Sequence, residues 1–213
     1  MDRSRFIEFL IDSEVIRFGE FVTKSGRKTP YFIDFGRYSD GEKLSTLGKF
    51  YAEVVNENFP EVTLLFGPAY KGISLSIVTA TKLYENYGKN VKVCYNRKEI
   101  KDHGEGGIII GNISQEDKVV IVEDVITSGG SIRESIEILK SNGNPKVLGA
   151  VVSVNRMEKG EKEKPAVEEI ESEFGIKVVS IVNVYHIIEF LRENRRFPKD
   201  MVRAMERHVL ANL

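Results

Sequence analysis

Residues 118–131, with the sequence KVVIVEDVITSGGS, constrain the fold of this chain more than any other stretch. The apolar, mostly β-branched residues that open it predict a strand buried on both faces. The apolar run stops at the adjacent acids Glu123 and Asp124, and a loop rich in hydroxyls and glycine follows. Apolar residues at the spacing of one helix face follow directly after this loop. Ser131 and Glu134 have the S-x-x-E spacing of a capping box, which predicts a helix that begins at Ser131.

The order of these residues indicates a site for a ligand that carries both a phosphate and a sugar diol. Gly129 and Gly130 allow the backbone to bend so that several N–H groups converge, and the helix dipole adds positive potential there. Thr127, Ser128 and Ser131 can add hydroxyl donors. The two acids would repel phosphate, but carboxylates are strong acceptors for sugar hydroxyls. The alternative is a plain strand-to-helix turn, and the cost of uncompensated charge at a buried strand end counts against it.

Strand-like and helical segments alternate along the rest of the chain. Further strands are expected at 62–66, 91–95, 107–110, 147–155 and 177–182, and helices at 3–12, 43–58, up to about residue 87, from about 165, and in the C-terminal 30 residues or so. This alternation predicts an α/β fold with a mostly parallel, doubly wound sheet. The length of 213 residues suits a single domain, 1–213, with one substantial core.

The expected domain has three parts. Residues 43–185 form the core, and residues 1–40 form a small N-terminal cap, or hood, over its carboxyl edge, to which the C-terminal end is a candidate contributor. A charged, glycine-ended insert at 98–106 reads as a mobile lid loop between two strands. The alternative for this insert is a solvated hairpin tip, and composition alone does not decide between the two.

Composition excludes several classes of function. A formal net charge of −1 gives no basic field that would indicate a nucleic-acid or anionic-membrane partner. The single cysteine, Cys94, excludes an internal disulfide and lies in an apolar, strand-like segment. No apolar run resembles a signal peptide or approaches the length of about 18 residues that a membrane span needs. We therefore expect a cytoplasmic protein.

Other segments carry cations and aromatic rings that could contact an anionic ligand. Lys24 lies in a polar turn just before Tyr31 and Phe32, which reads either as an exposed hairpin or as a surface for a planar anion. Tyr70 and Lys71 lie in the compact turn GPAYKGI, which suits a diphosphate. This turn lacks the residue order of an ATP-binding P-loop, and the chain lacks the G-x-G-x-x-G of a dinucleotide fold.

Two more positions complete the set of candidates. The insert carries four possible cationic donors, Arg97, Lys98, Lys101 and His103. Arg156 follows the strand expected at 147–155. Its position at the carboxyl end of that strand is where open α/β sheets present ligand-binding residues.

Together these segments resemble the orotate phosphoribosyltransferases, which belong to the type I phosphoribosyltransferases. EDVITSGGS (123–131) is similar to the signature that binds phosphoribosyl pyrophosphate (PRPP), and GPAYKGI (67–73) is similar to the pyrophosphate loop. RKEIKDHGEGG (97–107) resembles the catalytic lid, and FVTKSGRKTPYF (21–32) resembles the N-terminal substrate segment. The resemblance spans roughly residues 18–156, and the tail beyond carries no matching motif.

The resemblance implies roles for individual residues. The implied PRPP contacts are Lys24, Tyr70, Lys71, Arg97, Lys98, Lys101, His103, Glu123, Asp124, Val125, Ile126, Thr127, Ser128, Gly129, Gly130 and Ser131. The implied orotate contacts are Tyr31, Phe32, Thr127 and Arg156. Lys101 and Asp124 are the residues expected to act in catalysis. The resemblance also implies Mg²⁺ as a cofactor, held mainly by PRPP and water, and a homodimer whose subunits share lid residues.

The implied reaction is Mg²⁺-dependent transfer of ribose 5-phosphate from PRPP to N1 of orotate, which gives orotidine 5′-monophosphate and pyrophosphate in the de novo biosynthesis of UMP. Two alternatives stay open: another type I phosphoribosyltransferase of purine or uracil salvage, and a non-enzymatic PRPP-binding regulator. A regulator would typically carry a DNA-binding module or a basic surface, and the sequence offers neither. A pure binder would also have no need of the cationic lid.

Overall fold

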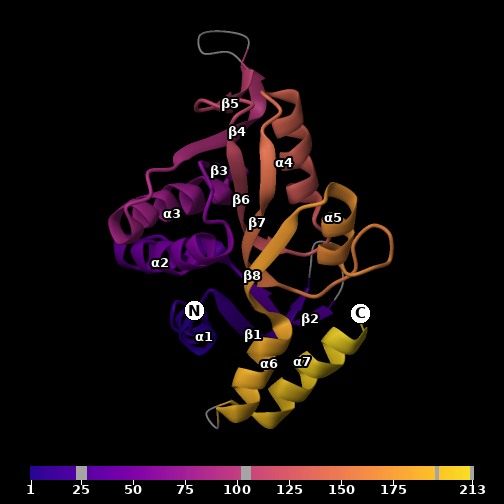
Figure 1. Ribbon diagram of the computed structural model, residues 1–213. Helices are drawn as coiled ribbons and strands as arrows, with labels where there is room; N and C mark the ends of the chain where they lie inside the picture. Colours follow the sequence, from indigo (N-terminus) through magenta and orange to yellow (C-terminus); the bar gives the residue numbers. More distant parts are fainter. Residues whose placement is uncertain (23–27, 102–106, 195–196, 212–213) are drawn as a thin grey trace.

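The computed structural model describes residues 1–22, 28–101, 107–194 and 197–211. Its centre is a sheet of six strands in the order β5-β4-β3-β6-β7-β8 (Figure 1). These strands are β3 (Leu64–Gly67), β4 (Lys92–Lys101), β5 (Gly107–Ile110), β6 (Lys118–Ile126), β7 (Lys146–Asn155) and β8 (Lys177–Asn183). Every neighbouring pair is parallel except β4 and β5, so the predicted mostly parallel sheet is confirmed.

Helices cover both faces of this sheet, as the alternating pattern predicts (Figure 1). Helices α2 (Gly41–Asn58) and α3 (Lys71–Tyr87) lie on one face, and α4 (Gly130–Ser141) and α5 (Ala166–Phe174) lie on the other. Alternate residues of β6 divide between the two cores: Val120 packs with the first helix pair and Ile121 with the second. This strand is buried on both faces because its side chains alternate between two helical layers.

The hood combines both ends of the chain. Strands β1 (Ile16–Val22) and β2 (Lys28–Ile33) form an antiparallel pair. Around them lie α1 (Arg3–Asp12), the short 3-10 helix η1 (Phe35–Arg37), α6 (Val184–Glu193) and α7 (Lys199–Ala211). The rings of Tyr31 on β2 and His208 on α7 meet edge to face, with centroids 5.8 Å apart. The C-terminal helices therefore belong to the hood.

The ends of β4 and β6 differ most from the predicted boundaries. The strand expected to end before the acid pair continues as β6 through Ile126, because it pairs with β7 as far as Asn155. The insert predicted as a loop over 98–106 begins as strand: β4 runs through Lys101, which pairs with Gly107 of β5. The remaining part, 102–106, lies outside the described residues, so its predicted role as a lid stays a prediction.

Candidate active site

The loop between β6 and α4 forms a small cavity of about 230 Å³, lined by Glu123, residues 125–131 and Ile132. Gly129 caps the helix in the left-handed conformation, with φ of +85°. A Cβ at this position would lie 2.4 Å from Cδ1 of Ile170, so the loop can pack against α5 only with glycine there. Pockets for whole ligands of drug size usually hold about 300–1,000 Å³. This cavity is therefore smaller than a site for a whole ligand of that kind, and it is large enough to hold a phosphate group.

The predicted capping box does not form. Helix α4 begins at Gly130, one residue earlier than expected, and no side chain caps it. The hydroxyl of Ser131 donates instead to Oε2 of Glu123. Of the other loop residues expected to meet PRPP, Thr127 and Ser128 are exposed, Val125 is half-buried and Ile126 is buried. All of them line the cavity.

The two adjacent acids have different environments. Glu123 is buried; besides Ser131, the backbone N–H of Asp124 donates to its Oε1 at 3.0 Å. Burial, reinforced by the nearby charge of Asp124, raises the pKa of Glu123 to about 7. Tyr51 on α2, which the sequence analysis missed, donates its hydroxyl to the backbone carbonyl of Glu123 at 2.7 Å. The carboxylate of Glu123 is thus held by internal hydrogen bonds, and its expected contact with the ribose hydroxyls stays a prediction.

Asp124 faces the turn between β3 and α3. Its Oδ2 lies 2.8 Å from Nζ of Lys71, although the two residues are 53 positions apart. The backbone N–H of Val125 donates to Oδ1 of the same carboxylate at 2.8 Å. The structure therefore brings together a cation and an acid that the sequence analysis assigned to the diphosphate and the diol.

The turn that carries Lys71 packs tightly against the sheet. A Cβ on Gly67 would lie 2.1 Å from the carbonyl oxygen of Gly72, so these two glycines allow a backbone approach that no other residue permits. The N–H of Ala69 donates to Oδ1 of Asn96 on β4 at 2.8 Å, and the Ala69–Tyr70 peptide bond is cis. Tyr70 is 74% exposed. The turn is thus attached to β4 through Ala69 and to β6 through Lys71, while Tyr70 projects outward.

The predicted lid cations are only partly described. Nη1 of Arg97 donates to the carbonyls of Gly107 and Ile109, so this guanidinium holds β5 against β4, and its expected contact with PRPP stays a prediction. Lys98 is exposed and lies with Tyr70 on a cavity of about 430 Å³ between β4 and the β3–α3 turn. Three expected contacts, the side chains of Lys24, Lys101 and His103, lie outside the described residues.

The expected orotate contacts on β2 point in different directions, because neighbouring residues of a strand face opposite sides. Tyr31 is only 1% exposed, and the guanidinium carbon of Arg156 lies 4.7 Å from its ring centroid. Burial raises the pKa of Tyr31 to about 12. Phe32 is 41% exposed and faces Phe21 and Arg17. The two rings therefore have different surroundings, with Tyr31 packed against Arg156 and Phe32 near the surface, and their expected contacts with orotate stay predictions.

Arg156 lies where the sequence placed it, at the end of β7. Its backbone N–H donates to the carbonyl of Ile126, which ties it to the β6–α4 loop. Its Nε donates to Oε1 of Glu158 at 2.7 Å. Glu158 is buried and was missed by the sequence analysis. The Arg-x-Glu spacing of these two residues was the sequence signal that could have indicated their pairing.

Two properties of the described residues bear on ligands and surroundings. No helix among them is both long and apolar enough to cross a membrane. Nor do three or more ligating His, Cys, Asp or Glu side chains gather anywhere in the described ranges.

The doubly wound fold and the glycine-rich cavity at a strand–helix turn are those expected of a phosphoribosyltransferase. In agreement, residues 36–186 match the family model described as "Phosphoribosyl transferase domain". The chain is 50% identical over 191 residues to an orotate phosphoribosyltransferase of Clostridium botulinum, which covers 89% of this chain and 85% of that relative. It is 46% identical over 189 residues to one from Salmonella agona, covering 89% and 88%.

A crystal structure of orotate phosphoribosyltransferase from Francisella tularensis superposes with a TM-score of 0.84 at 34% identity, over 97% of this chain and 98% of that one. The chain belongs to the orotate phosphoribosyltransferase family. It is accordingly an enzyme, a pentosyltransferase.

Proposed function

We propose that this chain acts in the cytoplasm as an Mg²⁺-dependent orotate phosphoribosyltransferase. It transfers ribose 5-phosphate from PRPP to N1 of orotate and releases orotidine 5′-monophosphate and pyrophosphate, in the de novo biosynthesis of UMP. The observation that carries the proposal is the 2.8 Å pair of Lys71 and Asp124. This pair brings the diphosphate turn to β6, whose end lines a cavity large enough to hold a phosphate.

The donor PRPP has three parts, and each has a partner in this arrangement. The 5-phosphate suits the β6–α4 cavity, where backbone N–H groups, the dipole of α4 and the exposed hydroxyls of Thr127 and Ser128 offer donors. The ribose diol suits the carboxylate of Asp124. The diphosphate suits Lys71 and the backbone of its turn.

The reaction breaks the bond between the anomeric carbon and a pyrophosphate oxygen and forms a bond from that carbon to N1 of orotate. Pyrophosphate leaves with the electron pair and gains negative charge, which Lys71 stabilises electrostatically. Asp124 favours the positive charge that develops on the ribosyl group. Removing one such stabilising donor typically costs about 10²–10³ in rate. Orotate is already an anion with an acidic N1, so a strong general base is unnecessary.

The carboxylate of Asp124 suits a magnesium ion that the substrate carries. Mg²⁺ is usually bound through one or two carboxylates together with substrate phosphates and water. Asp124 supplies one carboxylate beside the proposed diphosphate position, whereas Glu123 is engaged internally. When bound, the ion would neutralise charge on the diphosphate.

The acceptor is chosen by Arg156, whose guanidinium suits the carboxylate of orotate. The side chain is 14% exposed and its Nε is paired with Glu158, so an acceptor without a carboxylate would leave the Nη1 and Nη2 end of a largely buried guanidinium without an acceptor. Sites built around such a polar contact typically reject analogues that lack the group by about 10⁴–10⁵. This favours orotate over uracil and the purines.

We also propose that the enzyme is a homodimer whose subunits share lid residues, including Lys101 and His103. Among the described residues, eight large hydrophobic side chains are exposed, and four of them fall within residues 70–87. Ile77 and Tyr84 on α3 and Tyr70, which directly precedes this helix, are spaced by seven residues, so they lie along one side of it. An apolar stripe of this kind beside the proposed PRPP site suits a second copy of the chain.

The test is to incubate the protein with PRPP and Mg²⁺ and follow the loss of orotate absorbance, with hypoxanthine, adenine and uracil as parallel acceptors. Consumption of orotate alone is the expected result. Transfer to a purine or to uracil in place of orotate would replace the proposal with a salvage activity. Binding of PRPP with no acceptor consumed would indicate a regulator.

A further inference from the structure

We propose that Glu158 is a positioning residue that sets specificity for an acceptor base bearing a carboxylate, and that Glu169 holds Glu158 in place through the loop between β7 and α5. This inference rests on the proposed function, because it concerns how the acceptor site recognises orotate. Neither glutamate belongs to a motif that the sequence analysis assigned to a substrate.

Three contacts fix Arg156. Its backbone is tied to Ile126, the ring of Tyr31 lies against one face of its guanidinium at 4.7 Å, and Glu158 accepts a hydrogen bond from Nε at 2.7 Å. A guanidinium presents five N–H groups in a rigid, planar fork. Engagement of Nε by Glu158 leaves the end formed by Nη1 and Nη2 to meet a carboxylate through two parallel bonds. The geometry thus selects which edge of Arg156 the acceptor encounters.

Because both side chains are largely buried, the contact between Glu158 and Arg156 affects which acceptor base binds as well as the stability of the site. The side chains of Arg156 and Glu158 are 14% and 8% exposed. Removing one partner of such a pair leaves a poorly solvated charge. It also frees the guanidinium to turn, so that the acceptor must order a long side chain when it binds. That cost falls on the acceptor base and not on PRPP.

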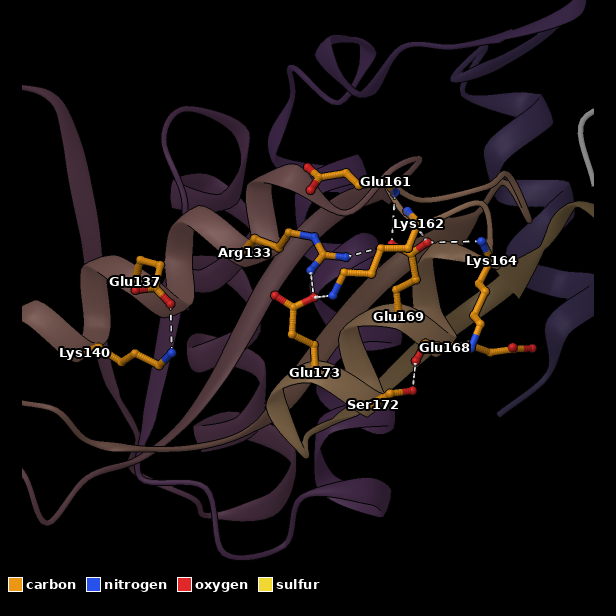
Figure 2. Close-up of polar contacts among 10 residues, drawn as sticks. All are labelled: Arg133, Glu137, Lys140, Glu161, Lys162, Lys164, Glu168, Glu169, Ser172 and Glu173. Carbon is orange, nitrogen blue, oxygen red and sulfur yellow. Dashed lines mark hydrogen bonds and ion pairs between the residues drawn. The ribbon is translucent and has the colours of Figure 1, made fainter.

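Glu169 on α5 shapes the loop from which Glu158 extends. Its carboxylate accepts the backbone N–H groups of Glu161, Lys162 and Lys164 at 2.9, 2.7 and 3.1 Å (Figure 2). Nη2 of Arg133 on α4 donates to the same carboxylate at 3.0 Å. Burial opposes ionisation of Glu169, but these N–H groups outweigh it and hold its pKa below the usual value.

The loop closes tightly around this carboxylate. A Cβ on Gly160 would lie 2.3 Å from Oε2 of Glu169, so the approach requires glycine. The N–H of Gly160 donates to the carbonyl of Lys164 at 2.7 Å, and the N–H of Ala166 donates to the carbonyl of Glu158 at 3.2 Å. Both ends of the loop are therefore tied together, and the backbone of Glu158 is tied to the start of α5.

This arrangement also links the two substrate sites. Arg133 lies in the first turn of α4, and its backbone N–H donates to the carbonyl of Gly129 in the phosphate loop. Its guanidinium reaches Glu169 and Glu173 on α5 (Figure 2). The carboxylate of Glu169 thus connects α4, which follows the phosphate loop, to the loop between β7 and α5, which carries Glu158.

The test compares Glu158→Gln with Glu163→Gln, which makes the same chemical change in the same loop at a side chain that is 83% exposed. Glu158→Gln should raise the KM for orotate about ten-fold, a typical cost of ordering one flexible side chain. The KM for PRPP should not change. The ratio of kcat/KM for orotate to that for uracil should fall, and Glu163→Gln should match the wild type in all three.

Further variants keep the inference testable if Glu158→Gln fails to fold. Glu158→Asp retains the charge and should keep an orotate KM between those of the wild type and Glu158→Gln. Glu169→Gln should raise the orotate KM in the same way, whereas Glu168→Gln, an exposed neighbour on α5, should not.

An unchanged orotate KM in Glu158→Gln and Glu169→Gln, or an equal rise in the KM for orotate and PRPP, would overturn the inference while the proposed function stands. If the wild-type protein does not use orotate, the proposed function itself fails and the inference falls with it.

Discussion

Replacing Glu123 with glutamine should change how the stability of the ligand-free protein depends on pH. Glu123 is 8% exposed, and burial together with the charge of Asp124 raises its pKa from 4.5 to about 7. A carboxyl whose pKa is raised on folding binds its proton more strongly in the folded state. Its stabilising contribution is therefore complete below pH 4.5 and is lost as pH rises through about 7.

The size of this effect follows from the separation of the two pKa values. Each unit of pKa corresponds to about 1.4 kcal/mol, so ionisation of Glu123 should remove about 3 kcal/mol of unfolding free energy between pH 4.5 and pH 8. Glutamine cannot ionise. It also places an amide against the donors of Ser131 and Asp124, which adds a cost that does not vary with pH. The expected signal is therefore the change with pH in the difference between the two proteins.

The assay is urea unfolding of wild type and Glu123→Gln without ligand, in steps from pH 4.5 to pH 8. The variant should gain about 3 kcal/mol relative to wild type across this range. Glu134→Gln, an exposed position on the neighbouring helix, is the matched control and should run parallel to wild type. Parallel curves for Glu123→Gln as well would refute the reasoning, because Glu123 would then have an ordinary pKa.

Two further predictions concern the β3–α3 turn and the exposed face of α3. Gly72→Ala places a Cβ 2.6 Å from Pro68 and 2.9 Å from the carbonyl oxygen of Val122, so urea unfolding should show a loss of about 1–3 kcal/mol. Gly41→Ala meets no atom within 4 Å and should cost nothing; equal stability of the two variants would contradict the packing argument. Tyr84→Lys should reduce the sedimentation mass from two chains to one, and a wild-type mass near 24.1 kDa would rule out the homodimer.

The fold could be predicted because its signals are local and repeated. Alternation of buried strands with amphipathic helices is enough to indicate a doubly wound sheet. The predicted strand ends were wrong where pairing with a neighbouring strand sets the length. Strand β6 continues past Glu123 and Asp124 because it pairs with β7 as far as Asn155. Strand β4 continues into the insert because it pairs with β5. The residues of one strand do not show how far the neighbouring strand extends, so these ends could not be predicted from local sequence.

The segments that form the site could be predicted from the sequence, but many of the contacts between their side chains could not. Ser131 has the spacing of a cap, but a tertiary partner, Glu123, takes its hydroxyl. Arg97 bonds to carbonyls that a reader of the sequence cannot place. Alternation along a strand predicts that Tyr31 and Phe32 face opposite sides, but the sequence near them does not show that His208 and Arg156 pack against Tyr31.

The bond between Lys71 and Asp124 has a consequence for which molecules can occupy the site. While it lasts, each charge neutralises the other. A lone pyrophosphate would attract Lys71 but leave Asp124 facing added negative charge, and a lone ribose would engage Asp124 but leave Lys71 without its anion. Only a molecule that carries both groups in one piece replaces both halves of the pair at once. Under the proposed function, the Lys71–Asp124 pair therefore favours binding of the intact donor over either of its two fragments.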